Sequence, residues 1–123
     1  MKNLCLVTML FLSILITSCA VQPQTDCIDW ACYSKNLEFT LASANDGCRK
    51  SALQHICNYT KFLKNIDVLV QPLSSLAQTD PDEEIRSMAE YALYKISVLY
   101  GKEYVLARLE PEQMENPLIL GLP

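Results

Sequence analysis

The 123-residue chain has few of the residues from which most catalytic and metal sites are built. It contains three glycines and one histidine, His55, and no two of its cysteines are spaced C-x-x-C. So little glycine excludes a glycine-rich phosphate loop, and a lone histidine argues against a zinc site. A Ser–His–Asp site would depend on His55, which is expected to be a partly exposed residue within a helix. The sequence therefore predicts a non-catalytic protein with no metal, no cofactor and no small-molecule substrate.

The chain also has no excess of basic residues. Its 10 lysines and arginines face 14 aspartates and glutamates, which gives a net charge of −4, or −5 when the count starts at Cys19 and omits Lys2. An acidic chain without a basic cluster argues against nucleic acid as a partner. It argues equally against attachment to anionic lipid headgroups by charge alone.

Only one long apolar run is present, and it lies at the N-terminus. Residues 4–16 carry no charge and follow Lys2, and two small residues then precede Cys19. A run of this length fits the ~7–15 residues of a signal-peptide core and falls short of the ~20 residues of a membrane-spanning helix. We predict a cleaved signal peptide over residues 1–18. An uncleaved anchor helix that extends to Val21 is the alternative.

Residues 16–19, Ile-Thr-Ser-Cys, resemble the lipobox of bacterial lipoproteins. The resemblance implies cleavage before Cys19, lipidation of its sulfur and acylation of the new amine with chains such as palmitate. Three acyl chains, at about 0.8 kcal/mol per buried methylene, would anchor the protein firmly. Ala20 after the cysteine favours the outer membrane and its periplasmic face, with the inner membrane and the cell surface as alternatives. Ordinary secretion, with Cys19 as a free or paired thiol, is the competing interpretation.

The rest of the chain is long enough for one domain. Residues 19–26 are expected to form a polar tether in which Pro23 prevents a helix. The domain itself should span residues 27–109. A loose tail over residues 110–123 is acidic first and apolar last, and the aliphatic residues within 116–123 either pack back on the helices or dock into a partner.

Four cysteines fall in the front half of this domain. In an exported protein they predict two disulfides, because export places the chain in an oxidising compartment. Cys48 and Cys57 would lie about 13 Å apart on one helix, which is too far for a bond. An extended 27–32 segment spans about 16 Å and could run parallel to that helix. We therefore prefer Cys27–Cys48 with Cys32–Cys57, and the crossed pairing Cys27–Cys57 with Cys32–Cys48 is the alternative.

Apolar residues recur at helical spacing through most of the domain. Pro72 interrupts the third helical segment and predicts either a start near Gln71 or a bend. The fourth segment is the clearest, with Asp80 as its predicted N-cap, Pro81 at its first helical position and Gly101 as its C-terminal cap. No segment alternates convincingly between apolar and polar residues, so we predict an all-α fold. The expected helices span 33–43, 47–63, 66–78, 81–100 and 102–109.

Residues 66–100 resemble a HEAT repeat, a helical hairpin that stacks on neighbouring copies. A second, degenerate copy lies upstream, where Arg49 precedes Arg86 by 37 residues, although this copy has no Asp-Pro pair. The resemblance implies a short stack of α-hairpins, in which disulfides worth about 2–4 kcal/mol each replace the missing third repeat. A disulfide-stapled four-helix bundle is the alternative. The positions that match the repeat are Leu73, Leu76, Asp80, Pro81, Ile85, Arg86, Ala89, Ala92, Leu93 and Ile96.

Together the two resemblances imply a lipid-anchored protein-interaction module that faces the periplasm. It would serve as an adaptor or assembly factor and bind a protein partner in the cell envelope, since helical repeats present surfaces to other proteins. The alternative is a lipid-anchored inhibitor or exclusion factor that acts on an incoming enzyme or transfer machinery. Trp30, close to Cys32, is expected to plug the core over the disulfides, with a binding-site tryptophan as the alternative.

Overall fold

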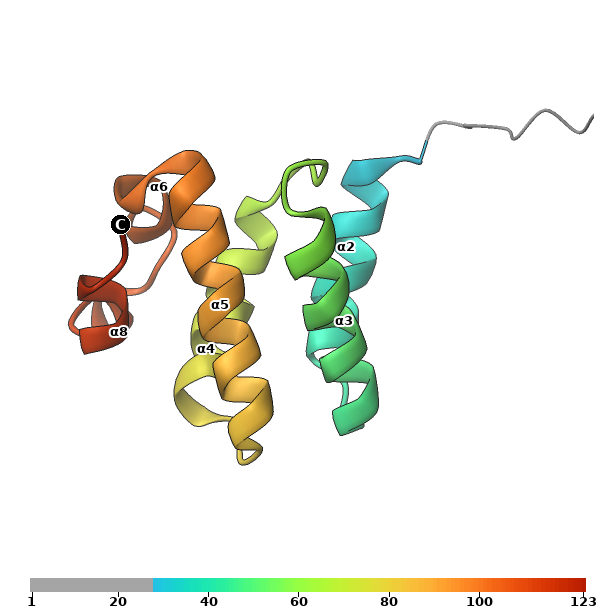
Figure 1. Cartoon of the computed structure of the whole chain (residues 1–123), viewed down its shortest axis with the longest axis horizontal. Coiled ribbons are helices and arrows are strands. Elements are labelled where there is room, and N and C mark those ends of the chain that lie inside the picture. The colour runs from blue at the N-terminus through green and yellow to red at the C-terminus, as the bar shows by residue number, and fades with distance from the viewer. Residues whose placement is uncertain (1–27) are drawn as a thin grey trace, which may run out of the picture.

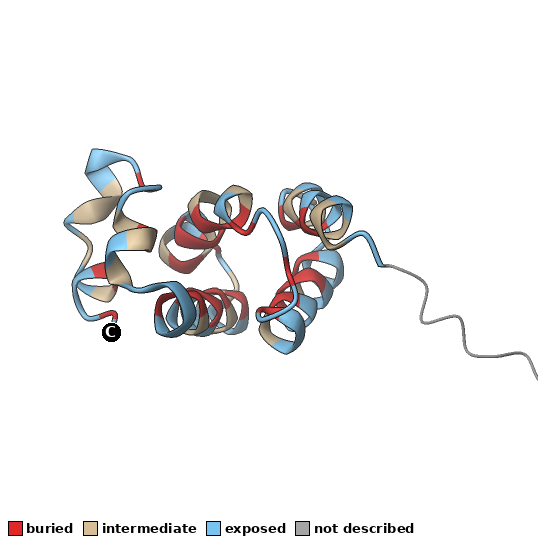
Figure 2. Cartoon of the chain, turned by 90° about the horizontal axis from the view of Figure 1, so that it is seen from above, coloured by how far each residue is buried: buried red, intermediate tan, exposed pale blue. Residues whose placement is uncertain are grey.

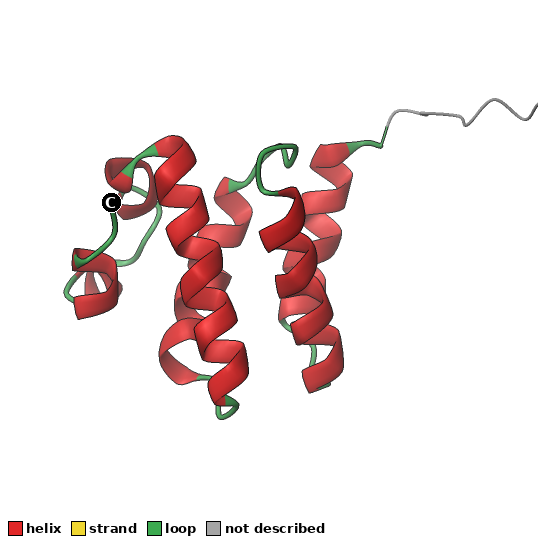
Figure 3. Ribbon diagram, viewed as in Figure 1, coloured by secondary structure: helices red, strands yellow, loops and turns green. Residues whose placement is uncertain are grey.

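Seven helices and no strand make up residues 28–123, the part of the chain that the computed structural model describes. The all-α prediction is confirmed for these residues (Figures 1 and 3). None of these helices is long and apolar enough to cross a bilayer. The predicted signal peptide, the lipidation site Cys19, the tether and Cys27 lie outside the described residues. The helices are α2 (Trp30–Leu41), α3 (Asp46–Tyr59), α4 (Asp67–Thr79), α5 (Glu83–Tyr100), α6 (Lys102–Leu106), α7 (Pro111–Met114) and α8 (Pro117–Leu120).

Polar caps determine where the first two helices begin. α2 starts at Trp30, three residues before the predicted start, because the Asp29 carboxylate accepts two backbone N–H groups of the first turn at 3.1 Å. α3 starts at Asp46 because the Asn45 side chain accepts a first-turn N–H at 3.1 Å. Each cap supplies an acceptor to amide groups for which the helix itself has none.

The start of α5 differs from the prediction. The sequence predicts Asp80 as the N-cap and Pro81 as the first helical residue, but the helix begins at Glu83 and Asp82 is its N-cap. The Asp80 carboxylate instead accepts the N–H of Asp82 at 2.9 Å within the α4–α5 turn, and it also pairs with Arg49 of α3. Its ion pair with the buried Arg49 holds Asp80 in the turn, so Asp82 takes the N-cap position of α5.

Proline and glycine mark two further points along these helices. Pro72 lies inside α4, which begins at Asp67, so the helix is not delayed to Gln71 as one prediction allowed. Gly101 is confirmed as the C-terminal cap of α5, and its N–H donates to the carbonyl of Ser97 at 2.8 Å. The φ of Gly101 is 91°, a conformation that glycine adopts without the clash a β-carbon would cause.

The first four helices form two α-hairpins, α2 with α3 and α4 with α5 (Figure 1). The hairpins lie side by side so that α2 packs on α4 and α3 packs on α5. Seen from above, the four helices stand at the corners of a square and turn their buried positions inward (Figure 2). The result is a compact helical bundle in which α3 and α5 form one layer.

Residues of the repeat motif form the centre of the core. The apolar motif positions of α5 are fully buried, and the small Ala89 and Ala92 leave room for the helices that pack beside them. Buried leucines and isoleucines of α3 and α4 complete the same cluster. The fully buried apolar residues of the hairpins are Leu53, Ile56, Leu69, Val70, Leu73, Ile85, Ala89, Ala92, Leu93 and Ile96.

The C-terminal segment, expected to be a loose tail, instead contains the short helices α7 and α8. It lies with α6 at the end of the molecule opposite α2, beyond α4 and α5 (Figure 1). Ile119 and Leu122 are buried in the same core as the hairpins, and Lys102 donates to the carbonyl of Leu120. Of the two alternatives for its aliphatic residues, the structure shows packing on the helices, because α4 and α5 would otherwise expose an apolar end.

Candidate functional site

An open groove of about 440 Å³ lies between the C-terminal end of α3 and the outer face of α5. Residues of α5 form one wall, and residues at and just after the end of α3 form the other. We call this feature the α3–α5 groove. It is lined by Asn58, Thr60, Lys61, Tyr91, Tyr94, Lys95, Val98 and Leu99.

The α5 wall of the groove is apolar and exposed. Tyr91, Tyr94, Val98 and Leu99 are each between 49% and 56% exposed, although all four are large apolar side chains. Positions 91, 94 and 98 follow helical spacing, so they share one face of α5. α5 is therefore apolar on two faces, one buried in the core and one open to solvent. A continuous exposed patch of this kind marks an interaction surface more often than an isolated exposed side chain does.

The polar groups of the groove are basic or neutral. Among residues 28–123, Lys61 and Lys95 are the only charged residues that line it, in a chain that is acidic overall. Lys95 donates to the carbonyl of Cys57 and lies 5.7 Å from the centroid of the Tyr91 ring, which stacks on Tyr94 at 6.4 Å. The groove thus offers stacked aromatic rings and two ammonium groups, a chemistry suited to an apolar segment that carries carboxylates.

A buried ion pair joins the two hairpins. Arg49 Nε lies 2.9 Å from Asp80 Oδ2, and the two side chains are only 9% and 3% exposed. The N–H at Nε makes no hydrogen bond of its own, whereas Nη2 donates to Asp80 Oδ1 at 3.5 Å, so charge and a hydrogen bond both join the two side chains. Arg49 also donates to the Asp46 carboxylate at 2.6 Å and to the carbonyl of Ser43 at 2.8 Å. Burial opposes the charge of Arg49, but the carboxylates of Asp80 and Asp46 outweigh it and raise the pKa of this guanidinium.

A second, more exposed ion-pair network links α3 to the start of α5. Lys50 Nζ lies 2.5 Å from Glu84 and 2.9 Å from Asp82. Its hydrogen bonds, first to Glu84 and then to Asp82, raise the pKa of the ammonium above its usual value. In return, the hydrogen bond from Lys50 holds the pKa of the Asp82 carboxyl below its usual value.

Replacing Lys50 with methionine is expected to raise the pKa of Asp82 toward that of a free carboxyl, about 3.9. A depressed folded-state pKa contributes stability that is fully present above the unfolded value and is lost as pH falls through the folded value. The difference in Tm between the wild-type protein and Lys50→Met should therefore be positive at pH 7 and shrink below about pH 4. NMR titration of the Asp82 carboxyl and thermal unfolding at several pH values would measure both effects.

Lys35→Met is the matched control, because Lys35 is an exposed lysine of α2 that makes no ion pair among the described residues. An Asp82 titration that is identical in the wild-type protein and Lys50→Met would contradict this assignment.

Three cysteines of the described chain carry free thiols. The preferred Cys32–Cys57 disulfide and the alternative Cys32–Cys48 disulfide are both absent from residues 28–123, so these two pairings are corrected. Cys32 is exposed on α2, whereas Cys57 turns toward α5, with its sulfur 3.9 Å from the carbonyl of Met88. Burial raises the pKa of the Cys57 thiol, and Lys95 opposes that shift. Both pairings with Cys27 lie outside the described residues.

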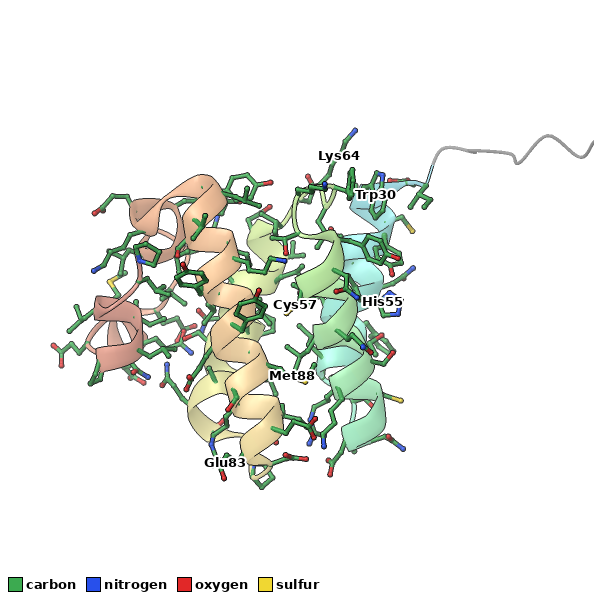
Figure 4. All side chains as sticks on the ribbon, viewed as in Figure 1. Trp30, His55, Cys57, Lys64, Glu83 and Met88 are labelled. Carbon is green, nitrogen blue, oxygen red and sulfur yellow. The ribbon has the colours of Figure 1, made fainter. Side chains whose placement is uncertain are left out.

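The only tryptophan and the only histidine belong to one aromatic cluster. Trp30 stacks on Phe62 at 5.5 Å and lies 5.9 Å from Tyr59, so it packs against aromatic rings and not over a disulfide. His55, exposed in the middle of α3 as predicted, shares a hydrogen bond with the hydroxyl of Tyr33. Burial and the neighbouring Tyr59 raise the pKa of Tyr33. The labelled view shows Trp30 near the point where the described chain begins, with His55 lower on the same hairpin (Figure 4).

The sequence-predicted residues and the groove are largely separate. The apolar motif positions of α5 lie in the core, Asp80 and Pro81 lie in the α4–α5 turn, and none of the motif residues lines the groove. The sequence does indicate the groove in one respect: Tyr91, Tyr94 and Val98 form a second apolar stripe on the face of α5 opposite the motif. Within residues 28–123, no three His, Cys, Asp or Glu side chains converge on a point where they could hold a metal ion.

Comparison of the chain with protein-family models, with curated proteins and with solved structures found no match.

Proposed function

We propose that this protein is a lipid-anchored protein-interaction module that serves as an adaptor or assembly factor in a bacterial cell envelope. The α3–α5 groove is its partner-binding surface, and the module has no catalytic role. The observation that carries the proposal is the half-exposed apolar wall formed by Tyr91, Tyr94, Val98 and Leu99. Interfaces draw their binding energy from a few such aromatic and aliphatic anchors.

The arrangement of the hairpins supports a HEAT-like stack over a ring-shaped four-helix bundle. In a ring-shaped bundle, consecutive helices are neighbours, so α3 would pack mainly on α4. In this protein α3 packs on α5 and α2 packs on α4, which is the neighbour relation of stacked repeats. In such stacks the equivalent helices of successive repeats form one shared surface, and here that surface holds the groove.

Two arginines that are 37 residues apart support the same internal repeat. Arg49 Nη1 donates to the carbonyl of Ser43 at 2.8 Å, and Arg86 Nη1 donates to the carbonyl of Asp80 at 2.6 Å. In both cases the acceptor lies six residues before the arginine, in the turn that precedes its helix. The two hairpins therefore close their turns in the same way, despite the missing Asp-Pro of the first copy.

The membrane anchor rests on residues 16–19 and on the short apolar run before them. We propose that the chain is cleaved before Cys19 and acylated there, and that it is held at the periplasmic face of the outer membrane. Ile28, where the described chain begins, lies only nine positions after Cys19. A partner of the groove would therefore be met close to a membrane surface.

Site-directed photo-crosslinking in cells tests the proposal. The photoreactive residue p-benzoylphenylalanine at position 94 should crosslink to one discrete envelope protein, whereas the same residue at position 35 of α2 should not. Adding Val98→Asp should reduce the crosslink roughly tenfold or more, because it places a carboxylate on the apolar wall. Position 98 is half exposed, so the Tm of the variant should remain close to that of the wild-type protein.

The Cys19→Ser variant completes this experiment. Intact mass should show acyl chains and a start at Cys19 on the wild-type protein, and neither of these on the variant. Equal crosslinking from positions 94 and 35, or no effect of Val98→Asp, would overturn the groove as the binding surface. A crosslinked subunit of a resident envelope complex fits the adaptor, whereas an incoming enzyme or transfer protein fits the alternative role of inhibitor or exclusion factor.

A further inference from the structure

The aromatic cluster around Trp30 leaves an apolar surface at one end of the first hairpin. We call its exposed part the aromatic corner: Ile28, Trp30, Tyr59 and Phe62, together with Lys61. Ile28, Tyr59 and Phe62 are between 39% and 56% exposed. Trp30 joins them through its stacking on Phe62 at 5.5 Å. None of α4 to α8 covers this corner, because the second hairpin packs on the other side of the first (Figure 1).

The chemistry of the aromatic corner matches the interface between a bilayer and water. Tryptophan and tyrosine rings carry an apolar body and a polar edge, and they prefer the level of the lipid headgroups. Lysine chains extend along such rings and place their ammonium groups among the headgroups. Lys61 Nζ lies 4.8 Å from the centroid of the Phe62 ring, and Lys64 lies at the same end of the molecule as Trp30 (Figure 4).

The position of the corner along the chain gives it access to that interface. The nine peptide units that join Cys19 to Ile28 can span at most about 32 Å, little more than the roughly 27 Å length of α5. A short tether of this kind gives an effective concentration in the millimolar range. A contact too weak to recruit a free protein would therefore still form when the chain is anchored at Cys19.

We propose that the aromatic corner rests in the headgroup region of the same bilayer that holds Cys19. This second contact fixes how the domain stands on the membrane. Lys61 belongs both to the corner and to the lining of the α3–α5 groove, so the groove then opens beside the membrane surface. The partner would present a membrane-proximal segment to it. The inference rests on the lipid anchor of the proposed function.

Trp30 is the only tryptophan of the chain, so its fluorescence reports on the corner directly. The mature protein purified from membranes is reconstituted into phosphatidylcholine vesicles, with or without bromine atoms on the upper part of the acyl chains. Bromine quenches only tryptophan that lies in or beside the bilayer. We expect the emission of Trp30 to fall at least twofold in the brominated vesicles relative to the vesicles without bromine.

A relocated tryptophan is the matched control. In the double variant Trp30→Phe, Glu112→Trp the reporter lies on the exposed side of α7, at the far end of the molecule, and should not be quenched. Equal quenching of the two reporters, or no quenching of Trp30, overturns the inference.

The failure of the anchor and the failure of the corner give different results. Intact mass decides whether Cys19 is acylated. In parallel, a second form of the chain carries a hexahistidine tag in place of acylated Cys19. Nickel-chelating lipid in the vesicles binds this tag, so the domain has a tether of similar length without natural lipidation. Unacylated Cys19 with quenched Trp30 in the tagged chain would refute the anchor and support the corner. Acylated Cys19 with unquenched Trp30 in both forms would refute the corner and leave the anchor.

Discussion

Asp80→Ala is expected to lower the free energy of unfolding by about 3 kcal/mol. The substitution leaves the buried Arg49 guanidinium without its main carboxylate partner, which lies 2.9 Å away. It also removes the acceptor of the Asp82 N–H in the α4–α5 turn. For a domain of this size the Tm should fall by roughly 10–20 °C. Urea and thermal unfolding followed by circular dichroism at 222 nm would measure both quantities.

Two further variants separate the charge from the hydrogen bond. Asp80→Asn keeps an acceptor for the turn and removes only the charge, so it should be less destabilising than Asp80→Ala. In the background of Arg49→Leu, Asp80→Ala should have a much smaller effect, because no buried charge is then left unpaired. A loss of less than about 1 kcal/mol in the wild-type background would show that the ion pair does not hold the two hairpins together.

Ile119→Ala in the C-terminal segment should lower the free energy of unfolding by about 2–4 kcal/mol. Ile119 is fully buried against the hairpins although it lies only four residues from the end of the sequence. Removing three of its side-chain carbons leaves a cavity between α8 and the rest of the core. Urea unfolding monitored by circular dichroism would give the change.

The neighbouring residue supplies the control for this prediction. Leu120 is 58% exposed, so Leu120→Ala should change the free energy of unfolding by no more than about 0.5 kcal/mol. If the two variants were equally stable, the segment would not be part of the core. Its aliphatic residues would then be free for a partner, which was the other interpretation of the sequence.

Much of the helical fold could be predicted because several local signals agree in α5. Its apolar residues repeat at helical spacing, Gly101 ends the helix, and the motif positions point to one buried face. The N-cap could not be assigned locally, because Asp80 and Asp82 are both good caps only two residues apart. The choice is made by Arg49, which is 31 residues from Asp80 in the chain and takes it into the buried turn.

The groove and the aromatic corner depend on contacts that the sequence does not reveal. Once α3 packs on α5, the stripe of Tyr91, Tyr94 and Val98 faces outward, and only the stacking of the hairpins decides that. Likewise, the pairing of Cys32 with Cys57 assumed that Cys57 faces the segment before α3. Its sulfur faces α5 instead, because Cys57 packs against the edge of the core between the two hairpins.

The C-terminal segment has a consequence for how copies of this chain can associate. A stack of hairpins has two open ends, and complementary ends would let copies add head to tail into an open filament. Arg49 binds Asp80 of the following hairpin. If the 37-residue repeat continued, a third hairpin would carry the matching aspartate at position 117. That position holds Pro117, the first residue of α8. In the place of a third hairpin, α8 buries Ile119 against the core and closes that end. Ile119 of α8 thus occupies the apolar end of α4 and α5 that a further hairpin would otherwise cover.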